Sequence, residues 1–236
     1  MGYYGYGYYF DPTYLLVLIG AILCIWAQTR VKSTYRKYSR IVSRTGMTGA
    51  QAAQRILQLS GIYDVRIEHV AGNLTDHYDP ANKVLRLSDS VYASPSVAAI
   101  GVAAHECGHA VQHDKGYAPL KFRSALVPVA NIGSKAGIPL IILGAILGMN
   151  QTLIHIGIWV FAFAVLFQVV TLPVEFNASG RALAMLGDYG MLDREETNGC
   201  RKVLQAAALT YVAAAASAIL QLLRLVLLFG GNRRRD

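Results

Sequence analysis

Four long apolar stretches constrain the fold of this 236-residue chain more than any other feature. They lie at residues 12–29, 125–149, 153–172 and 206–229. The first has no charged side chain along its whole length, which suffices for a helix that spans a bilayer. Of all residues, 54% are hydrophobic and 15% are charged, against about 25% charged in soluble domains. This composition excludes a disordered tail protein, argues against a soluble enzyme and favours a multi-pass membrane protein.

A run of basic side chains without any acidic one directly follows the first stretch. Its members are Arg30, Lys32, Arg36, Lys37, Arg40 and Arg44. A signal peptide carries its basic residues before the apolar run, so residues 12–29 are predicted to form an uncleaved transmembrane helix. The positive-inside rule then places the basic run in the cytoplasm and the N-terminus outside. Because its position beside a span accounts for this run, no nucleic-acid partner is predicted.

The stretches at 125–149 and 153–172 are separated by three polar residues and predict a transmembrane hairpin over residues 125–172. Pro128 and Pro139 lie in the first of them, so its inner end is expected to be irregular. A hairpin returns the chain to the side of the membrane from which it left. The segments before and after it are therefore expected in one compartment.

The two ends of the chain carry conflicting signals. Residues 206–229 are predicted to span the membrane, although Arg224 lies among them and the basic tail at 230–236 would then lie outside, against the positive-inside rule. The Tyr/Gly-rich tip at 1–11 fits either an aromatic anchor at the membrane surface or a loose terminus.

The polar part before the hairpin mixes helical and strand patterns. Residues 47–61 form an amphipathic pattern that Thr48 could cap. Polar and apolar residues alternate at 64–70 and 83–88, with turn residues before the second segment, which predicts a small sheet with a hairpin. The segment at 83–88 either offers an open edge for an extended peptide or is an internal strand.

The next predicted helix carries a motif with a chemical meaning. Ser94 is expected to cap it and Pro95 to occupy its first position, and the helix should end near Gly116. Only ten apolar residues precede its first polar cluster, so a buried helix is favoured over a membrane span.

That cluster is His105-Glu106-Cys107-Gly108-His109, an H-E-x-x-H sequence. Residues i and i+4 share one face of a helix, so both imidazoles can bind one ion while the glutamate reaches a metal-bound water. From this composition roughly 0.003 such matches are expected by chance. The apolar flanks fit a helix within a core better than a solvated surface, and we predict that His105 and His109 bind zinc.

Catalytic zinc sites have three protein ligands and one open position, so a third ligand is required. Gln112 and Lys115 stand where the extended H-E-x-x-H-x-x-G-x-x-H pattern needs glycine and histidine, which excludes that class. His113 lies one further turn along the helix, about 6 Å by helix rise, and is poorly placed to share the ion.

Glu175 is the preferred third ligand. It follows the predicted hairpin and therefore lies in the same compartment as the two histidines, and Pro173 is expected to start a new helix or kink the old one. The competing carboxylates lie in a more polar stretch and read as surface charge: Asp188, Asp193, Glu195 and Glu196. A donor for the oxyanion is also expected, with His77, Arg181 and Tyr211 as unranked candidates, Arg181 being disfavoured by its helix face.

The segments HECGHAVQH, LPVEFNAS, DHYDP…KVLRLS and TYVAAA resemble the bacterial membrane-bound neutral zinc metallopeptidases, the YugP-like family, over nearly the whole chain. The layout is more distantly similar to the CAAX prenyl protease and heat-shock membrane protease superfamily. There a glutamate beginning an E-x-x-x-D motif is the third ligand. The resemblance implies that role for Glu175, but Ser179 occupies the position of the aspartate, which leaves the supporting partner of the histidines unidentified.

These observations predict an α+β zincin-like catalytic domain, built from residues 30–124 and 173–205, combined with a multi-pass α-helical membrane region. The expected activity is that of a gluzincin-type endopeptidase with one Zn²⁺, whose bound water is activated by Glu106. Membrane or membrane-proximal polypeptides are the expected substrates, and the catalytic domain should face the cytoplasm at a bacterial inner membrane. An intramembrane zinc protease and a non-hydrolytic, zinc-containing membrane scaffold or chaperone remain alternatives, and the oligomeric state stays open.

Overall fold

The computed structural model describes residues 11–230, which form six helices and three short strands. The helices are α1 (Tyr14–Tyr38), α2 (Gly49–Leu59), α3 (Val97–Asp114), α4 (Ala118–Ile146), α5 (Gln151–Asp188) and α6 (Arg194–Phe229). The strands are β1 (Arg66–Val70), β2 (His77–Asp79) and β3 (Val84–Ser88). The expectations for the Tyr/Gly-rich tip and for the terminal arginines fall on residues outside this range.

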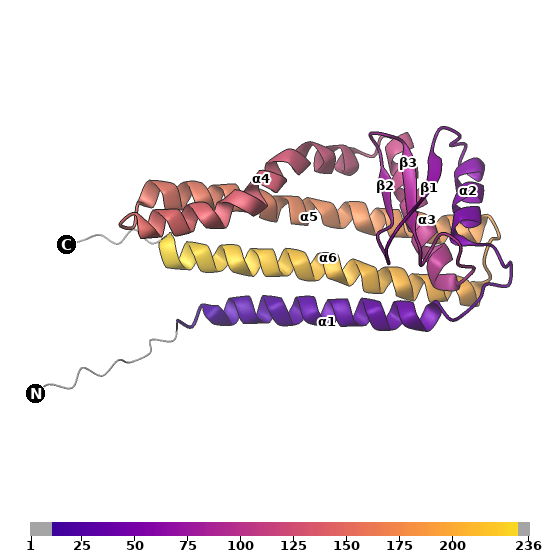
Figure 1. The fold of residues 1–236 in the computed structure, drawn as a ribbon, viewed down its shortest axis with the longest axis horizontal. Helices are drawn as coiled ribbons and strands as arrows, with labels where there is room; N and C mark the ends of the chain where they lie inside the picture. The colour runs from indigo at the N-terminus through magenta and orange to yellow at the C-terminus, as the bar shows by residue number, and fades with distance from the viewer. Residues whose placement is uncertain (1–10, 231–236) are drawn as a thin grey trace, which may run out of the picture.

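Four of the helices, α1, α4, α5 and α6, are long and apolar enough to cross a bilayer, and they cover most of the four predicted stretches. Figure 1 shows them extending along one direction, with the strands, α2 and α3 gathered at one end. Large apolar side chains on these helices face outward: Trp26 is 53% exposed and Trp159 is 71% exposed. Extensive apolar surface of this kind suits contact with lipid, so the helices support association with a membrane.

The predicted hairpin is present as α4 and α5, which pack along each other (Figure 1). Gly148 and Met149 turn the chain with φ angles of 72° and 62°, and the side chain of Asn150 caps α5 by accepting a bond from the backbone of Leu153. The inner end of α4 was expected to be irregular. This expectation is wrong, because the helix is continuous through both Pro128 and Pro139. Figure 1 shows instead that α4 changes direction along its length, as proline-containing helices do.

Two further helices are longer than the apolar patterns that revealed them. Helix α1 continues through the basic run as far as Tyr38. Helix α5 continues through Pro173 to Asp188, so this proline does not start a new helix but lies inside the old one. One helix therefore carries both the second arm of the hairpin and Glu175.

The sheet has the strand order β1-β3-β2, with β3 parallel to β1 and antiparallel to β2. The predicted small sheet is confirmed, but the two predicted strand segments pair in parallel, and the hairpin is formed by β3 with β2, a strand that was not predicted. The possible open edge at residues 83–88 is wrong, because β3 has a hydrogen-bonded neighbour on each side. Strand β2 instead forms the edge of the sheet beside α3, which it contacts.

Helices α2 and α3 and strand β3 share one apolar core, in which Ile56, Leu85 and Ile100 are fully buried. Thr48 caps α2 as predicted, through reciprocal bonds with Gln51.

The expected start of α3 at Ser94 and Pro95 is two residues too early. Ser96 is the capping residue, and its hydroxyl accepts a bond from the backbone N–H of Ala99. The carbonyls of Ser94 and Pro95 instead accept hydrogen bonds from the backbone N–H groups of Gly49 and Ser43. Ser94 and Pro95 are therefore paired with the segment that leads into α2 and do not belong to α3. This tertiary pairing outweighs the local preference for proline at the first helical position.

Arg224, the charge within the last apolar stretch, has partners at the far end of α1. Its guanidinium lies 3.6 Å from the carboxylate of Asp11 and 4.2 Å from the centroid of the Tyr14 ring. An ion pair and a cation–π contact compensate this charge, and they join the C-terminal part of α6 to the beginning of α1.

Candidate metal centre

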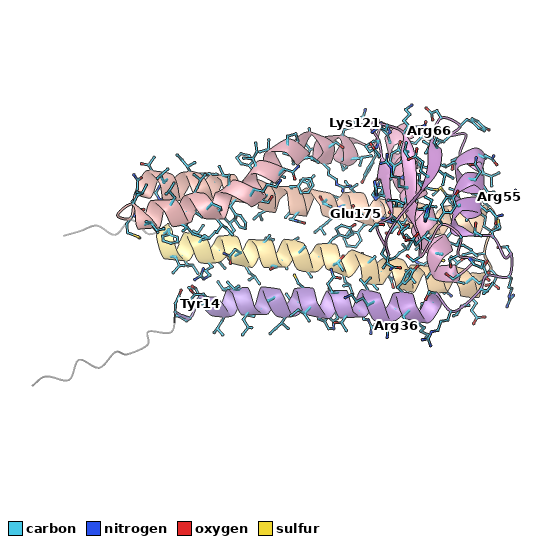
Figure 2. The ribbon with its side chains drawn as sticks, in the orientation of Figure 1. Tyr14, Arg36, Arg55, Arg66, Lys121 and Glu175 are labelled. Atoms are coloured by element: carbon cyan, nitrogen blue, oxygen red, sulfur yellow. The ribbon has the colours of Figure 1, made fainter. Side chains whose placement is uncertain are left out.

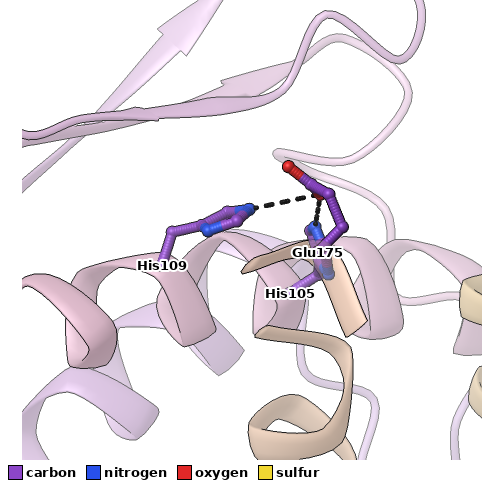
Figure 3. Close-up of side chains that lie close together, drawn as sticks. All are labelled: His105, His109 and Glu175. Atoms are coloured by element: carbon purple, nitrogen blue, oxygen red, sulfur yellow. Dashed lines mark hydrogen bonds and ion pairs between the residues drawn. The ribbon is translucent and has the colours of Figure 1, made fainter. Parts of the chain in front are cut away.

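His105, His109 and Glu175 meet where α3 crosses α5, close to the end of the molecule that carries the sheet (Figure 2). The histidines are one turn apart on α3, and both direct Nε2 at the same carboxylate oxygen of Glu175 (Figure 3). The distances from Oε2 are 3.3 Å to His105 and 3.6 Å to His109. One potential ligand atom from each residue lies within 4.8 Å of the others, so a single cation could contact all three.

Close packing of two helix backbones makes this meeting possible. A Cβ atom on Gly108 would lie 2.5 Å from the carbonyl oxygen of Ala178. Because Gly108 immediately precedes His109, the missing side chain lets α5 approach α3 at the motif itself. Glycine is therefore required there by the close approach of a backbone.

Both imidazoles are held through their second ring nitrogen. Nδ1 of His105 lies 3.1 Å from the hydroxyl of Ser179, and Nδ1 of His109 lies 3.0 Å from the side-chain oxygen of Gln112. The amide group of Gln112 in turn donates to the carbonyl of Val174 and to the side chain of Asn177. These contacts orient the rings and leave both Nε2 atoms directed at Glu175.

Ser179 thus supplies the supporting partner that the sequence left unidentified, whereas Gln112 was missed in that role. The signal for Gln112 was its position three residues after His109, within reach on the same helix face.

Glu175 has a further partner that the sequence did not reveal. Its side chain is 3% exposed, and its second oxygen, Oε1, lies 3.3 Å from the guanidinium of Arg123 on α4. A buried carboxylate needs such compensation, and the contact also fixes the orientation of the carboxyl group. No short-range pattern points to Arg123, because it lies far from Glu175 in the sequence.

The environment of His109 favours a charged imidazole. Burial lowers the pKa of His109. The hydrogen bond with Glu175 and the charge of Glu106 lead the effects that raise it, and these effects together exceed that of burial, so the net pKa lies above the usual value. The same negative surroundings would attract a divalent cation.

Glu106, the glutamate of the motif, is 8% exposed and lies between two cavities. The α4-side cavity, about 250 Å³, is lined by His77, Tyr78 and Arg123 together with the metal-centre residues His109 and Glu175. The α1-side cavity, about 170 Å³, is largely apolar and includes Leu74, Val102 and Leu204 as well as His105. Asp76, Glu106 and Tyr211 line both cavities, so space for a ligand exists on either side of Glu106.

The candidates for an oxyanion donor separate into two groups. His77 and Tyr211 line the α4-side cavity. Arg181 does not: its Nε donates to Asn177 at 2.8 Å, and its guanidinium lies 5.9 Å from the centroid of the Tyr117 ring.

The alternative ligands lie away from the cluster. Nδ1 of His113 is 2.9 Å from the hydroxyl of Tyr78. Burial, followed by the charges of nearby aspartates, raises the pKa of Tyr78 to about 12, so this hydroxyl keeps its proton and can donate it. Asp193 and Glu196 form the capping box of α6.

Asp76 is a further acidic residue that the sequence did not single out. It accepts bonds from the backbone N–H and the hydroxyl of Ser88, at 2.7 and 2.9 Å. Burial raises the pKa of Asp76 although these bonds oppose the shift.

Comparisons with known proteins show the family to which the chain belongs. A family model described as "Putative neutral zinc metallopeptidase" matches residues 13–230. The protein named "Putative membrane protease YugP" from Bacillus subtilis (strain 168) is 48% identical over 221 residues, which cover 93% of this chain and 98% of that protein. No solved structure matches. The chain belongs to the neutral zinc metallopeptidase family that this model describes.

Proposed function

We propose that this protein is a zinc-dependent, membrane-anchored endopeptidase of the gluzincin type, and that His105, His109 and Glu175 hold one zinc ion. The observation that carries the proposal is the convergence of two imidazole nitrogens from α3 and one buried carboxylate oxygen from α5, with His105 and Glu175 separated by 70 residues in the sequence. Two histidines and a glutamate are a ligand set of catalytic zinc, and the residues present therefore fit the ion.

The proposed chemistry assigns the proton transfers to Glu106. His105, His109 and Glu175 would hold the zinc ion, which would supply Lewis-acid polarisation of a peptide carbonyl and a lowered pKa of water. Glu106 accepts the proton of the attacking water and delivers it to the departing amine. Its position between the two cavities allows the substrate to extend on both sides of the cleaved bond.

Tyr211 and His77 are the proposed donors to the developing oxyanion, since both line the α4-side cavity. Removal of an oxyanion donor typically lowers kcat by about 10²–10³-fold. Replacement of Tyr211 by phenylalanine and of His77 by alanine would show which of the two has this role.

The zincin-like description is also a proposal, supported by a small sheet packed beside the motif helix. Strand β2 is an edge strand, and His77 and Tyr78 of this strand line the α4-side cavity. An extended substrate could therefore add to the free edge of β2 by main-chain hydrogen bonds.

We further propose that the metal centre faces the cytoplasm of a bacterial cell, with membrane or membrane-proximal polypeptides as substrates. The basic end of α1 lies at the same end of the molecule as the sheet, and Tyr14 lies at the other end (Figure 2). The positive-inside rule then orients the sheet inward. The position of the ligands beside the polar sheet favours this reading over an intramembrane protease.

Cysteine labelling tests this orientation. Lys115 follows the motif helix and is exposed, and Met149 lies in the turn of the hairpin at the opposite end. In a chain without Cys24, Lys115→Cys should react with an impermeant maleimide only in inside-out vesicles, and Met149→Cys only in right-side-out vesicles. The reverse pattern would refute the orientation.

Cleavage of casein by the purified full chain tests the activity. Glu106→Gln should lower the rate by about 10²–10⁴-fold and keep bound zinc, because the substitution removes a proton acceptor and leaves the ligands. Glu195→Gln, at an exposed carboxylate outside the two cavities beside Glu106, is the matched control and should cleave normally. Full activity of Glu106→Gln would defeat the catalytic assignment and favour a scaffold.

A further inference from the structure

A cavity of about 520 Å³ lies between α1 and α6, separate from the metal centre, and its lining is basic. Arg30 and Lys37 line it from α1, and Lys202 lines it from α6. The hydroxyl residues Ser33 and Thr34 also contribute, whereas no acidic residue lines this cavity. Three positive charges around one space repel one another, and a bound anion would relieve that repulsion.

These charges are not used within the part of the chain that the structure describes. None of Arg30, Lys37 and Lys202 belongs to an ion pair among residues 11–230. The ammonium group of Lys37 lies 5.6 Å from the centroid of the Tyr38 ring, a contact that leaves its protons free to donate.

Two of the three neighbouring acidic groups have partners of their own, and the third, Glu195, is exposed and does not line the basic cavity. An adjoining cavity shares Lys37 and Lys202 and includes acidic residues at the start of α6. Of these, Asp193 pairs with the guanidinium of Arg44 at 2.7 Å, and Glu196 accepts the backbone N–H of Arg44 at 2.6 Å. They therefore do not neutralise the basic cavity directly.

The position of the cavity along the helices points to the kind of anion. Arg30 directly follows the uncharged run at 12–29, and Ala206 begins the last apolar stretch. Helices α1 and α6 lie side by side and run in opposite directions (Figure 1), so these two boundaries come to the same level. Ala206 and Leu209 add an apolar part to the lining. A basic site next to apolar surface at this level matches a phospholipid, with its charged headgroup and its acyl chains.

We propose that this cavity binds the phosphate group of an anionic phospholipid, with Arg30, Lys37 and Lys202 as donors and the acyl chains leaving past Ala206 and Leu209. A free phosphate would satisfy the same donors but not the apolar part. The depth of the site rests on the proposed membrane spans of α1 and α6. The binding itself does not depend on peptidase activity.

Lipid titration of the full chain in detergent, followed by native mass spectrometry, tests the proposal. Phosphatidylglycerol and phosphatidylcholine with identical acyl chains are compared, and inorganic phosphate is the third ligand. The intact protein should bind one phosphatidylglycerol at least about tenfold more tightly than phosphatidylcholine, because both lipids carry an anionic phosphodiester but the three basic side chains repel the positive choline group. Inorganic phosphate should not compete at equal concentration.

Two double variants with equal loss of charge separate a site from general electrostatic attraction. Arg30→Gln with Lys202→Gln should abolish the preference for phosphatidylglycerol. Arg36→Gln with Arg40→Gln should keep it, because these side chains belong to the same basic run but do not line the cavity. Figure 2 places Arg36 on the side of α1 that faces away from α6.

An equal loss of preference in both double variants would overturn the proposal, as would equal affinity of the intact protein for the two lipids. Displacement by inorganic phosphate at equal concentration would instead identify a free phosphate as the ligand and reject the lipid. The melting temperature of Arg30→Gln with Lys202→Gln in detergent, compared with that of the intact protein, verifies the fold and keeps this test separate from that of the peptidase. If this variant is unfolded, Leu209→Gln, which alters the apolar part alone, should weaken the binding of phosphatidylglycerol but not that of phosphate.

Discussion

The hydroxyl oxygen of Ser179 lies 3.1 Å from Nδ1 of His105, and Ser179 stands one helical turn beyond Glu175 on α5. The same helix therefore supplies the proposed third ligand and the group that orients a histidine of the other helix. When Nε2 of His105 binds a metal, Nδ1 carries the proton and donates it to Ser179.

Ser179→Ala is expected to weaken zinc binding by about 10–100-fold, because the ring of His105 loses its orienting acceptor. Competition with a fluorescent zinc chelator measures the affinity. Ser39→Ala, at a hydroxyl that bonds only to the backbone of Arg36, is the matched control and should bind zinc normally. Equal affinities of the two variants would show that Ser179 does not support the site.

Glu175→Gln is expected to remove nearly all bound zinc, because the substitution keeps the shape of the side chain and removes the anionic ligand. Zinc per protein after purification, determined by elemental mass spectrometry, is the measurement, and Glu195→Gln serves as the control. The variant also leaves Arg123 without its carboxylate, so its melting temperature is compared with that of the parent. A full equivalent of zinc in a folded Glu175→Gln protein would mean that the third ligand lies elsewhere.

Gly108→Ala is expected to destabilise the protein by about 1–3 kcal/mol, the usual cost of an extra methyl group in a packed interior. The new Cβ would lie 2.5 Å from the carbonyl of Ala178, and the backbone cannot easily move away. Gly180→Ala is the matched control on α5: its Cβ meets nothing within 4 Å, and alanine should stabilise the helix by about 0.5–1 kcal/mol. Thermal unfolding in detergent should thus shift in opposite directions for the two variants, and a parallel shift would contradict the close packing.

The lowered pKa of Asp79 predicts that the stability of the turn between β2 and β3 depends on pH. Hydrogen bonds from the side chain and backbone of Asn82 lower the pKa of Asp79 from 3.8 to about 2, and Arg86 contributes further. Because the folded-state pKa is lowered, the stabilisation is complete above about pH 4 and is lost as the pH falls towards 2. Amide hydrogen exchange in this turn should accelerate over that range in the parent protein, after correction for the intrinsic rate. In Asp79→Asn the corrected exchange should be independent of pH, and an unchanged dependence in that variant would refute the assignment.

Local patterns were sufficient for much of the fold. The long apolar runs correspond to α1, α4, α5 and α6, and the capping pattern at Thr48 marks the start of α2. The start of α3 was misplaced because Ser94 and Pro95 are engaged by a distant segment, which no local pattern reveals. The strand order could not be predicted either, because the alternation of polar and apolar residues identifies β3 as a strand but does not show which strands lie beside it.

The residues of the candidate site likewise fall into those that the sequence predicts and those that it does not. His105 and His109 follow from helical periodicity, and Glu175 from the requirement that a hairpin returns the chain to one side, and the structure brings these three residues together. Arg123 and Asp76 were missed because their proximity depends on the direction of α4 and on the path of the loop before β2. Such contacts arise from the angles between elements, which sequence spacing does not encode.

The continuity of α5 from Gln151 to Asp188 has a practical consequence. An α-helix turns by about 100° per residue, so removing a single residue between the hairpin and Glu175 would swing the carboxylate away from both imidazoles. The apolar arm of the hairpin and the proposed ligand are thus parts of one continuous helix. Deleting the hairpin to obtain a soluble enzyme would therefore also remove the part of α5 that positions the carboxylate of Glu175.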